Sequence, residues 1–133
     1  MAGRKASAAE TPPAVPFRVE RLRRRADFLA AARARRAATP GFTLQARARA
    51  DEEPGGAAIR VGFTCSRKVG NAVARNRAKR RLREAARLTL PRLGRPGWDY
   101  VLIGRPEATA VRPFEAMLAD LERALARVHV AGT

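Results

Sequence analysis

A run of positive charge with a helical repeat limits what this chain can fold into more than any other feature. From Ser66 to Arg87 the sequence reads SRKVGNAVARNRAKRRLREAAR, in which Glu84 is the one acid among many Arg and Lys residues. Successive residues on a helix are about 100° apart, so small apolar residues fall on one stripe and polar or cationic residues on the opposite side. The stripe is Ala74, Ala78, Leu82, Ala85 and Thr89, and the opposite side is Asn76, Lys79, Arg80, Arg83 and Arg87. The pattern predicts a helix that packs with one face and offers the other to an anion.

The expected start of this helix is suited to a phosphate. Asn71 follows the flexible Gly70 and is a favourable N-cap, so free backbone N–H groups lie beside Arg67 and Lys68. The alternative is a helix whose charges are simply solvated. A solvated helix usually mixes both signs of charge, and this one hardly does, so we favour contact with nucleic acid.

The charge of the whole chain indicates the same partner. The 133 residues carry a formal charge of +16 and have a sequence pI near 11.8, which implies salt-sensitive binding to an anionic macromolecule. The length suits one domain with its own core. Cys65 is the single cysteine, so no internal disulfide forms, and we expect a small buried thiol in a reducing cytoplasm. Neither a membrane span nor a signal peptide is expected.

Groups suited to catalysis are few in the sequence. His129, the one histidine, is expected to be solvated in a frayed C-terminal tail. Asp51, Glu52 and Glu53 form the one acidic cluster, and we interpret it as a solvated loop rather than a metal site. We therefore predict no catalytic residue, no metal site and no cofactor bound by the protein itself.

Periodicity and turn residues predict a single α+β domain between two tails. We expect a disordered tail over residues 1–19, a domain over 20–129 and a short tail over 130–133. The expected elements follow the order helix, strands, helix, strand, helix. They are a helix over 24–38, a strand over 42–48, a hairpin-type loop over 51–56, a strand over 57–65, the basic helix ended by Pro91, a strand over 98–104, and a helix from about Pro113 through Val128.

One segment resembles a known family. The run RVGFTCSRKVGNAVARNRAKRRLREA, residues 60–85, is similar to the signature of the bacterial ribonuclease P protein component. The family core is Arg-Asn-Arg followed by Lys-Arg, after Gly-Asn-Ala-Val. Here these residues are Gly70, Asn71, Ala72, Val73, Arg75, Asn76, Arg77, Lys79 and Arg80. A looser likeness covers roughly residues 20–128.

The resemblance implies details of the fold that the pattern alone does not give. It implies an α–β sandwich of order αβββαβα, in which a small mixed sheet is covered by helices. A short additional strand is expected near Ala38 to Gly41. The basic helix is expected to belong to a split βαβ unit with a left-handed crossover, where pattern reading alone predicts a right-handed one.

The resemblance also implies a function. The chain would be the protein subunit of ribonuclease P, an accessory subunit of an endoribonuclease that removes the 5′ leader of precursor tRNA. The RNA subunit would perform the hydrolysis with Mg²⁺, and one protein monomer would join one RNA. The alternative is a structural RNA-binding protein, such as a ribosomal protein or an RNA chaperone, which would have a similar charge.

Site residues follow from the same resemblance. The predicted RNA-binding residues are Arg67, Lys68, Asn71, Arg75, Asn76, Arg77, Lys79, Arg80 and Arg83, and the predicted leader-binding residues are Phe28, Phe42, Arg60, Arg67 and Lys68. Stacking of bases on the two Phe rings would tolerate any leader sequence, and ordinary core packing is the alternative for both rings. Two expected aromatic positions hold Ala32 and Gln45 instead, which predicts a less aromatic cleft.

Overall fold

One mixed sheet of five strands organises the chain. The structure is a computed structural model, and it describes residues 18–130. The strand order is β1-β4-β5-β3-β2, where β4 is parallel to β1 and β5, and β3 is antiparallel to β5 and β2. The strands are β1 (Val19–Arg21), β2 (Arg35–Ala38), β3 (Phe42–Ala48), β4 (Ile59–Thr64) and β5 (Trp98–Gly104). The expected α+β class is confirmed.

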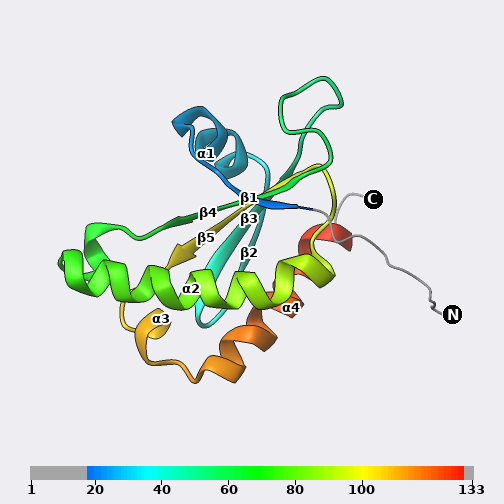
Figure 1. Cartoon of the computed structure of the whole chain (residues 1–133). Helices are drawn as coiled ribbons and strands as arrows, with labels where there is room; N and C mark the ends of the chain where they lie inside the picture. The colour runs from blue at the N-terminus through cyan, green and yellow to red at the C-terminus, as the bar shows by residue number, and fades with distance from the viewer. Residues whose placement is uncertain (1–17, 131–133) are drawn as a thin grey trace, which may run out of the picture.

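Helices cover the two faces of the sheet unequally. In Figure 1, α1 (Arg25–Ala32) lies on one side of the sheet, whereas α2 (Ala72–Leu93) and α4 (Phe114–Val130) lie on the other. A 3₁₀ turn, η1 (Arg67–Val69), precedes α2, and the short α3 (Ala108–Val111) precedes α4. The parallel strands β4 and β5 are joined through α2, and the left-handed sense of this crossover stays a prediction. No helix in residues 18–130 is long and apolar enough to cross a membrane.

Alternation along the strands builds two hydrophobic clusters. Phe42, Leu44 and Ala46 of β3 face the larger cluster, which packs the sheet against α2 and α4. The smaller cluster lies under α1 and contains Leu22, Ala31 and Val101, with Phe28 and Ile103 packed against it. Thr43 and Gln45 of β3 are also buried, so both faces of β3 are covered. The alternating pattern had predicted that only one face would be covered.

The first helix is shorter than the predicted range of 24–38. It ends at Ala32, and the residues expected to continue it form strand β2. The segment Arg35–Ala38 forms an antiparallel ladder with β3, and Thr39 closes the turn by donating from its backbone N to the Phe42 carbonyl at 2.9 Å. Strand pairing across this turn overrides the helix propensity of an Ala- and Arg-rich segment. The additional strand implied near Ala38 to Gly41 is therefore β2, a few residues earlier.

Three other boundaries differ from expectation. The 51–56 loop is not a hairpin, because β5 lies between the two strands that it joins. Helix α2 continues through Pro91 to Leu93. Strand β1 begins at Val19, inside the predicted N-terminal tail, and α4 reaches Val130, the first residue of the predicted C-terminal tail. The rest of both predicted tails, 1–17 and 131–133, lies outside the described residues.

Candidate nucleic-acid interface

Two successive caps set the start of α2. The Ser66 hydroxyl accepts from the backbone N of Lys68 at 3.2 Å, and the Asn71 side chain accepts from the backbone N of Ala74 at 2.9 Å. Gly70 between them has φ +140°, and a Cβ there would lie 2.8 Å from the Ala74 Cβ, so glycine fits this turn. The predicted N-cap at Asn71 is confirmed, and the turn carries Arg67 and Lys68 next to the positive end of the helix dipole.

Seven cations on this turn and helix form what we call the α2 cationic face. None of them makes a salt bridge with a carboxylate among residues 18–130. Two are half-buried and the other five are exposed, as is Asn76. The members are Arg67, Lys68, Arg75, Arg77, Lys79, Arg80 and Arg83. Uncompensated cations on one surface attract polyphosphate strongly and in a salt-dependent way.

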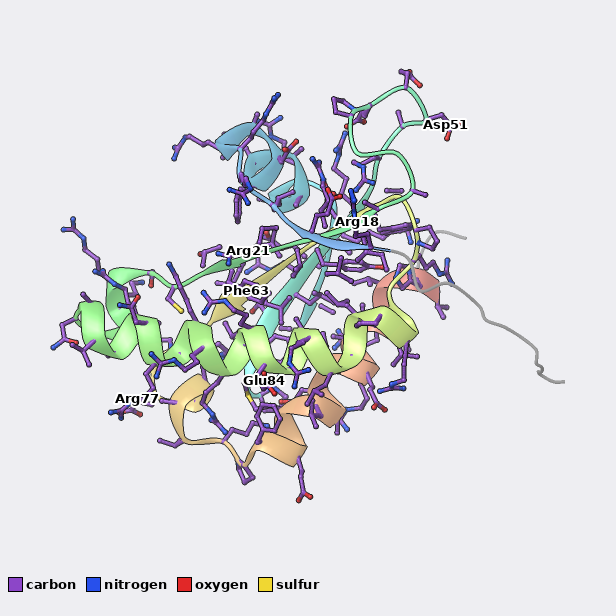
Figure 2. All side chains as sticks on the ribbon, viewed as in Figure 1. Arg18, Arg21, Asp51, Phe63, Arg77 and Glu84 are labelled. Atoms are coloured by element: carbon purple, nitrogen blue, oxygen red, sulfur yellow. The ribbon has the colours of Figure 1, made fainter. Side chains whose placement is uncertain are left out.

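Other arginines on α2 are already engaged within the protein. Arg81 donates to the backbone carbonyls of Thr109 and Arg112, each at 2.7 Å, and so fastens α3 to α2. Arg87 forms a bidentate pair with Glu84, which lowers the pKa of that carboxyl and raises the pKa of Arg87. The free charge is thus concentrated towards the N-terminal half of α2, where Arg77 projects from the helix in Figure 2.

The opposite face of α2 holds the helix on the sheet. Leu82 and Leu90 are fully buried in the larger cluster. Four small or polar residues of the same face, Ala78, Ala85, Ala86 and Thr89, are buried as well. The predicted division into a packing face and a cationic face is therefore confirmed, although Ala74 in the first turn is only half-buried.

Phe28 is half-buried between α1 and the sheet. A Cβ at Gly62 would lie 2.5 Å from two atoms of the Phe28 ring, so the ring rests on a part of β4 that has no side chain. The ring also packs against the smaller cluster. Because the ring is partly exposed and also packs on the sheet, leader binding by Phe28 stays a prediction.

Phe42 does not fit its predicted role. Its side chain is 0% exposed and lies in the larger cluster, on the α2 and α4 side of the sheet. A base cannot stack on a ring without accessible surface, and Phe28 is on the other side. The prediction that Phe42 binds the leader was wrong, because strand alternation places this residue towards the core.

Arg60 takes part in a buried ion network that the sequence analysis missed. Its guanidinium donates to both carboxylate oxygens of Asp99 at 2.8 Å, which raises the pKa of Arg60. Arg49 donates to the same carboxylate at 2.5 Å and to the carbonyls of Gly56 and Ala58 at 2.8 and 2.6 Å. The network ties the β3–β4 loop to the sheet. Arg60 is thereby engaged by Asp99, and by Asp27 at 3.5 Å, which argues against its predicted role in leader binding.

His129 is also placed differently from our expectation. It is 5% exposed, lies in the last turn of α4, and its Nε2 is 2.7 Å from the Tyr100 hydroxyl. The Trp98 ring meets it edge-on at a centroid distance of 4.5 Å. Burial, with the nearby charges of Arg95 and Arg35, lowers the pKa of His129 to about 4. The expected solvated tail residue is instead a neutral core residue, because α4 continues past it.

The remaining candidates for chemistry are a paired carboxylate, two exposed carboxylates and a half-buried thiol. Glu53 accepts from both terminal nitrogens of Arg47, at 3.0 and 2.7 Å, and its pKa is lowered mainly by this pairing. Asp51 and Glu52 are exposed in the loop. Cys65 is half-buried, and burial raises the pKa of its thiol. Within residues 18–130, no three His, Cys, Asp or Glu side chains are grouped so as to hold a metal ion.

The family model and the relatives that match this chain all belong to one family. The model of the family described as Ribonuclease P matches residues 17–129. The ribonuclease P protein component of Ruegeria pomeroyi is 64% identical over 122 residues, covering 89% of this chain and 96% of the relative. That of Caulobacter vibrioides is 50% identical over 117 residues, covering 88% and 74%.

Solved structures agree with the fold. The RNase P protein from Thermotoga maritima superimposes with a TM-score of 0.66 at 28% identity, covering 81% of this chain and 96% of that chain. The RNase P protein from Staphylococcus aureus gives 0.63 at 27% identity, covering 81% and 95%.

Proposed function

Since this chain belongs to the ribonuclease P protein family, we propose that it binds the ribonuclease P RNA through the α2 cationic face. The chain is an accessory subunit of ribonuclease P and associates with the ribonuclease P RNA. The proposal rests mainly on the absence of salt bridges at the seven cations of this face within residues 18–130. Each phosphate neutralised there would release counterions from the RNA.

The proposed division of labour leaves hydrolysis to the RNA. Two residues that could move a proton are poorly suited to it, because His129 is buried against Tyr100 and Glu53 is paired with Arg47. Magnesium ions held by the RNA would supply the chemistry of cleavage. The protein would reduce repulsion between two RNAs, and thereby lower the Mg²⁺ concentration that assembly and cleavage require. We also propose that one protein monomer assembles with one RNA, and that the complex is cytoplasmic.

The substrate part of the proposal concerns the 5′ leader of precursor tRNA. Phe28 is the half-buried aromatic ring on the α1 side of the sheet, and Arg67 and Lys68 are exposed where β4 leads into α2. A stacked base and two phosphates of a single strand would suit these groups, with little dependence on sequence. Without Phe42 and Arg60, the proposed leader contacts are fewer than the sequence analysis predicted.

Reconstitution tests both parts. The full chain is added to ribonuclease P RNA at low Mg²⁺, and cleavage is compared for precursor tRNA with a leader of several nucleotides and with a leader of one nucleotide. We expect the chain to restore cleavage, with a larger gain for the longer leader. Unchanged cleavage at low Mg²⁺ would contradict the proposal, and so would cleavage by the chain without RNA.

A further inference from the structure

A hollow on the α2 side of the sheet shares one residue, Arg83, with the α2 cationic face. It has a volume of about 230 Å³, an almost entirely apolar lining, and walls from β1, β4 and α2. Val61 and Ala86 are its buried apolar lining residues, and the ring of Phe63 in the same lining is half-buried. Drug-sized ligands usually need about 300–1,000 Å³, so the hollow suits one smaller planar group.

Two guanidiniums lie over the same ring in this hollow. Arg21 of β1 is 6.0 Å and Arg83 of α2 is 5.7 Å from the centroid of Phe63, distances at which a cation is attracted to an aromatic ring. Figure 2 shows Arg21 beside Phe63, between the sheet and α2. An aromatic ring with two cations nearby offers both a stacking surface and anion ligands.

Some charged side chains around the hollow are paired with an opposite charge, and others are not. Neither Arg21 nor Arg83 pairs with a carboxylate in the described part of the chain, residues 18–130. By contrast, Arg87 in the same lining is paired with Glu84 at 2.6 Å. Glu20, the one carboxylate in the lining, is paired with Arg18 at 3.0 Å. The unpaired charge at the hollow is therefore positive and belongs to the two arginines that flank Phe63.

The ligand class follows from this chemistry. A planar apolar surface with two flanking cations matches one unpaired nucleotide, because every base has a π-face and each neighbouring phosphate needs a cation. Arg83 also belongs to the α2 cationic face, so the hollow is continuous with the proposed RNA-binding surface. Resting on that proposed function, we propose that the hollow holds one unpaired base of the ribonuclease P RNA, stacked at Phe63, with its flanking phosphates on Arg21 and Arg83.

The first test removes the aromatic surface and keeps the packing. Phe63→Leu in the full chain is compared with the matched control Phe114→Leu, since Phe114 is also half-buried and has a guanidinium, that of Arg81, 5.9 Å from its ring. Stacking of one base is worth about 1–3 kcal/mol, so Phe63→Leu should weaken binding to the ribonuclease P RNA about 5- to 150-fold. Phe114→Leu should leave affinity within about twofold. Equal affinities for the two variants would overturn the proposal.

The second test is independent of the core. Arg21 is exposed, so Arg21→Gln should fold normally. It should lower the slope of log affinity against log salt by about 0.7–0.9, the value of one phosphate contact. Arg92→Gln, which removes an exposed cation already paired with Glu122, is the control and should change the slope by less than half as much. Identical slopes for Arg21→Gln and Arg92→Gln would contradict a phosphate at Arg21.

A further variant separates this inference from the function on which it rests. If Phe63→Leu and Arg21→Gln bind normally while Arg77→Gln with Arg80→Gln loses affinity, the base site is wrong and the RNA-binding function stands. If the latter variant also binds normally, the proposed function itself fails. A change in oligomeric state without a change in RNA affinity would assign the hollow to a second copy of the chain, and so overturn the base site.

Discussion

The arginines around Asp99 and those on the outer face of α2 are the same residue type in opposite settings. The Arg49 side chain is 1% exposed and is held by a fully buried carboxylate, whereas Arg80 is exposed and has no salt bridge within residues 18–130. The first kind stabilises the protein, since a buried charge needs its partner. The second kind leaves positive charge available to a partner. The net charge of +16 therefore does not distinguish the two roles. The position of each arginine in the fold does.

The largest effect on stability is expected from the buried carboxylate of Asp99, which pairs with two arginines. Asp99→Asn keeps the size of the side chain, leaves Arg49 without its counter-charge and leaves Arg60 with the more distant Asp27 carboxylate at 3.5 Å. Removing one partner of a buried ion pair costs about 3–5 kcal/mol, and we expect a loss of that order in the free energy of unfolding. Denaturant titration measures it. A loss below about 1 kcal/mol would show that the network does not stabilise the fold.

A second expected effect concerns pH and the buried imidazole. The pKa of His129 is about 4 in the fold, against 6.5 ordinarily, so the fold favours the neutral ring. Its contribution is fully present above pH 6.5 and is lost as the pH falls from 6.5 towards 4. We expect a loss of about 2–3 kcal/mol across this window, at about 1.36 kcal/mol per pKa unit.

Carboxylates also titrate at low pH, so the His129 effect needs a variant. Urea unfolding of the wild type and of His129→Gln between pH 7 and 4.5 isolates it. The difference in stability between the two should shrink as the pH falls. A difference that stays constant with pH would mean that His129 is not held neutral.

The next effect concerns RNA binding by arginines of the α2 cationic face. Arg75→Gln together with Arg77→Gln removes two cations of the α2 cationic face and should weaken binding to the ribonuclease P RNA about 10- to 100-fold, as expected for loss of two charged contacts. The free energy of unfolding should change by about 0.5 kcal/mol or less. Filter binding and denaturant titration measure the two quantities. A large loss of stability with intact affinity would reverse the assignment.

The smallest effect separates two adjacent arginines. Arg81 donates to the carbonyls of Thr109 and Arg112, so Arg81→Gln should lower the free energy of unfolding by about 1–2 kcal/mol and change RNA affinity by less than twofold. Arg80→Gln should leave stability unchanged and weaken RNA binding several-fold. Should both variants behave alike in both assays, position on the helix would not determine the role of an arginine here.

Prediction from sequence succeeds for the elements whose structure is decided by local patterns. Strand β3 has the predicted bounds, 42–48, and the cap at Asn71 follows from the type of residue and its place before the helix. Prediction failed where pairing with a segment distant in sequence decides the structure. Arg35–Ala38 becomes a strand because β3 is available to pair with it, and helix propensity contains no information about that partner.

The same distinction applies to the site. The cationic face of α2 could be predicted because its charges and its packing residues share one helix. The burial of Phe42 and the pairing of Arg60 with Asp99 could not, because they depend on which face of the sheet α2 and α4 cover and on which strand lies beside β4. His129 was misjudged because its partner Tyr100 is 29 residues away in sequence.

The most direct test is the salt dependence of binding for two triple variants of equal charge. Arg77, Lys79 and Arg80 change to Gln in one, and the carboxylate-paired Arg47, Arg92 and Arg123 change to Gln in the other. We predict that the first variant lowers the slope of log affinity for the ribonuclease P RNA against log salt by about 2–3, and that the second lowers it by less than about 1. Equal reductions in the two slopes would contradict the account, because net charge alone would then explain binding.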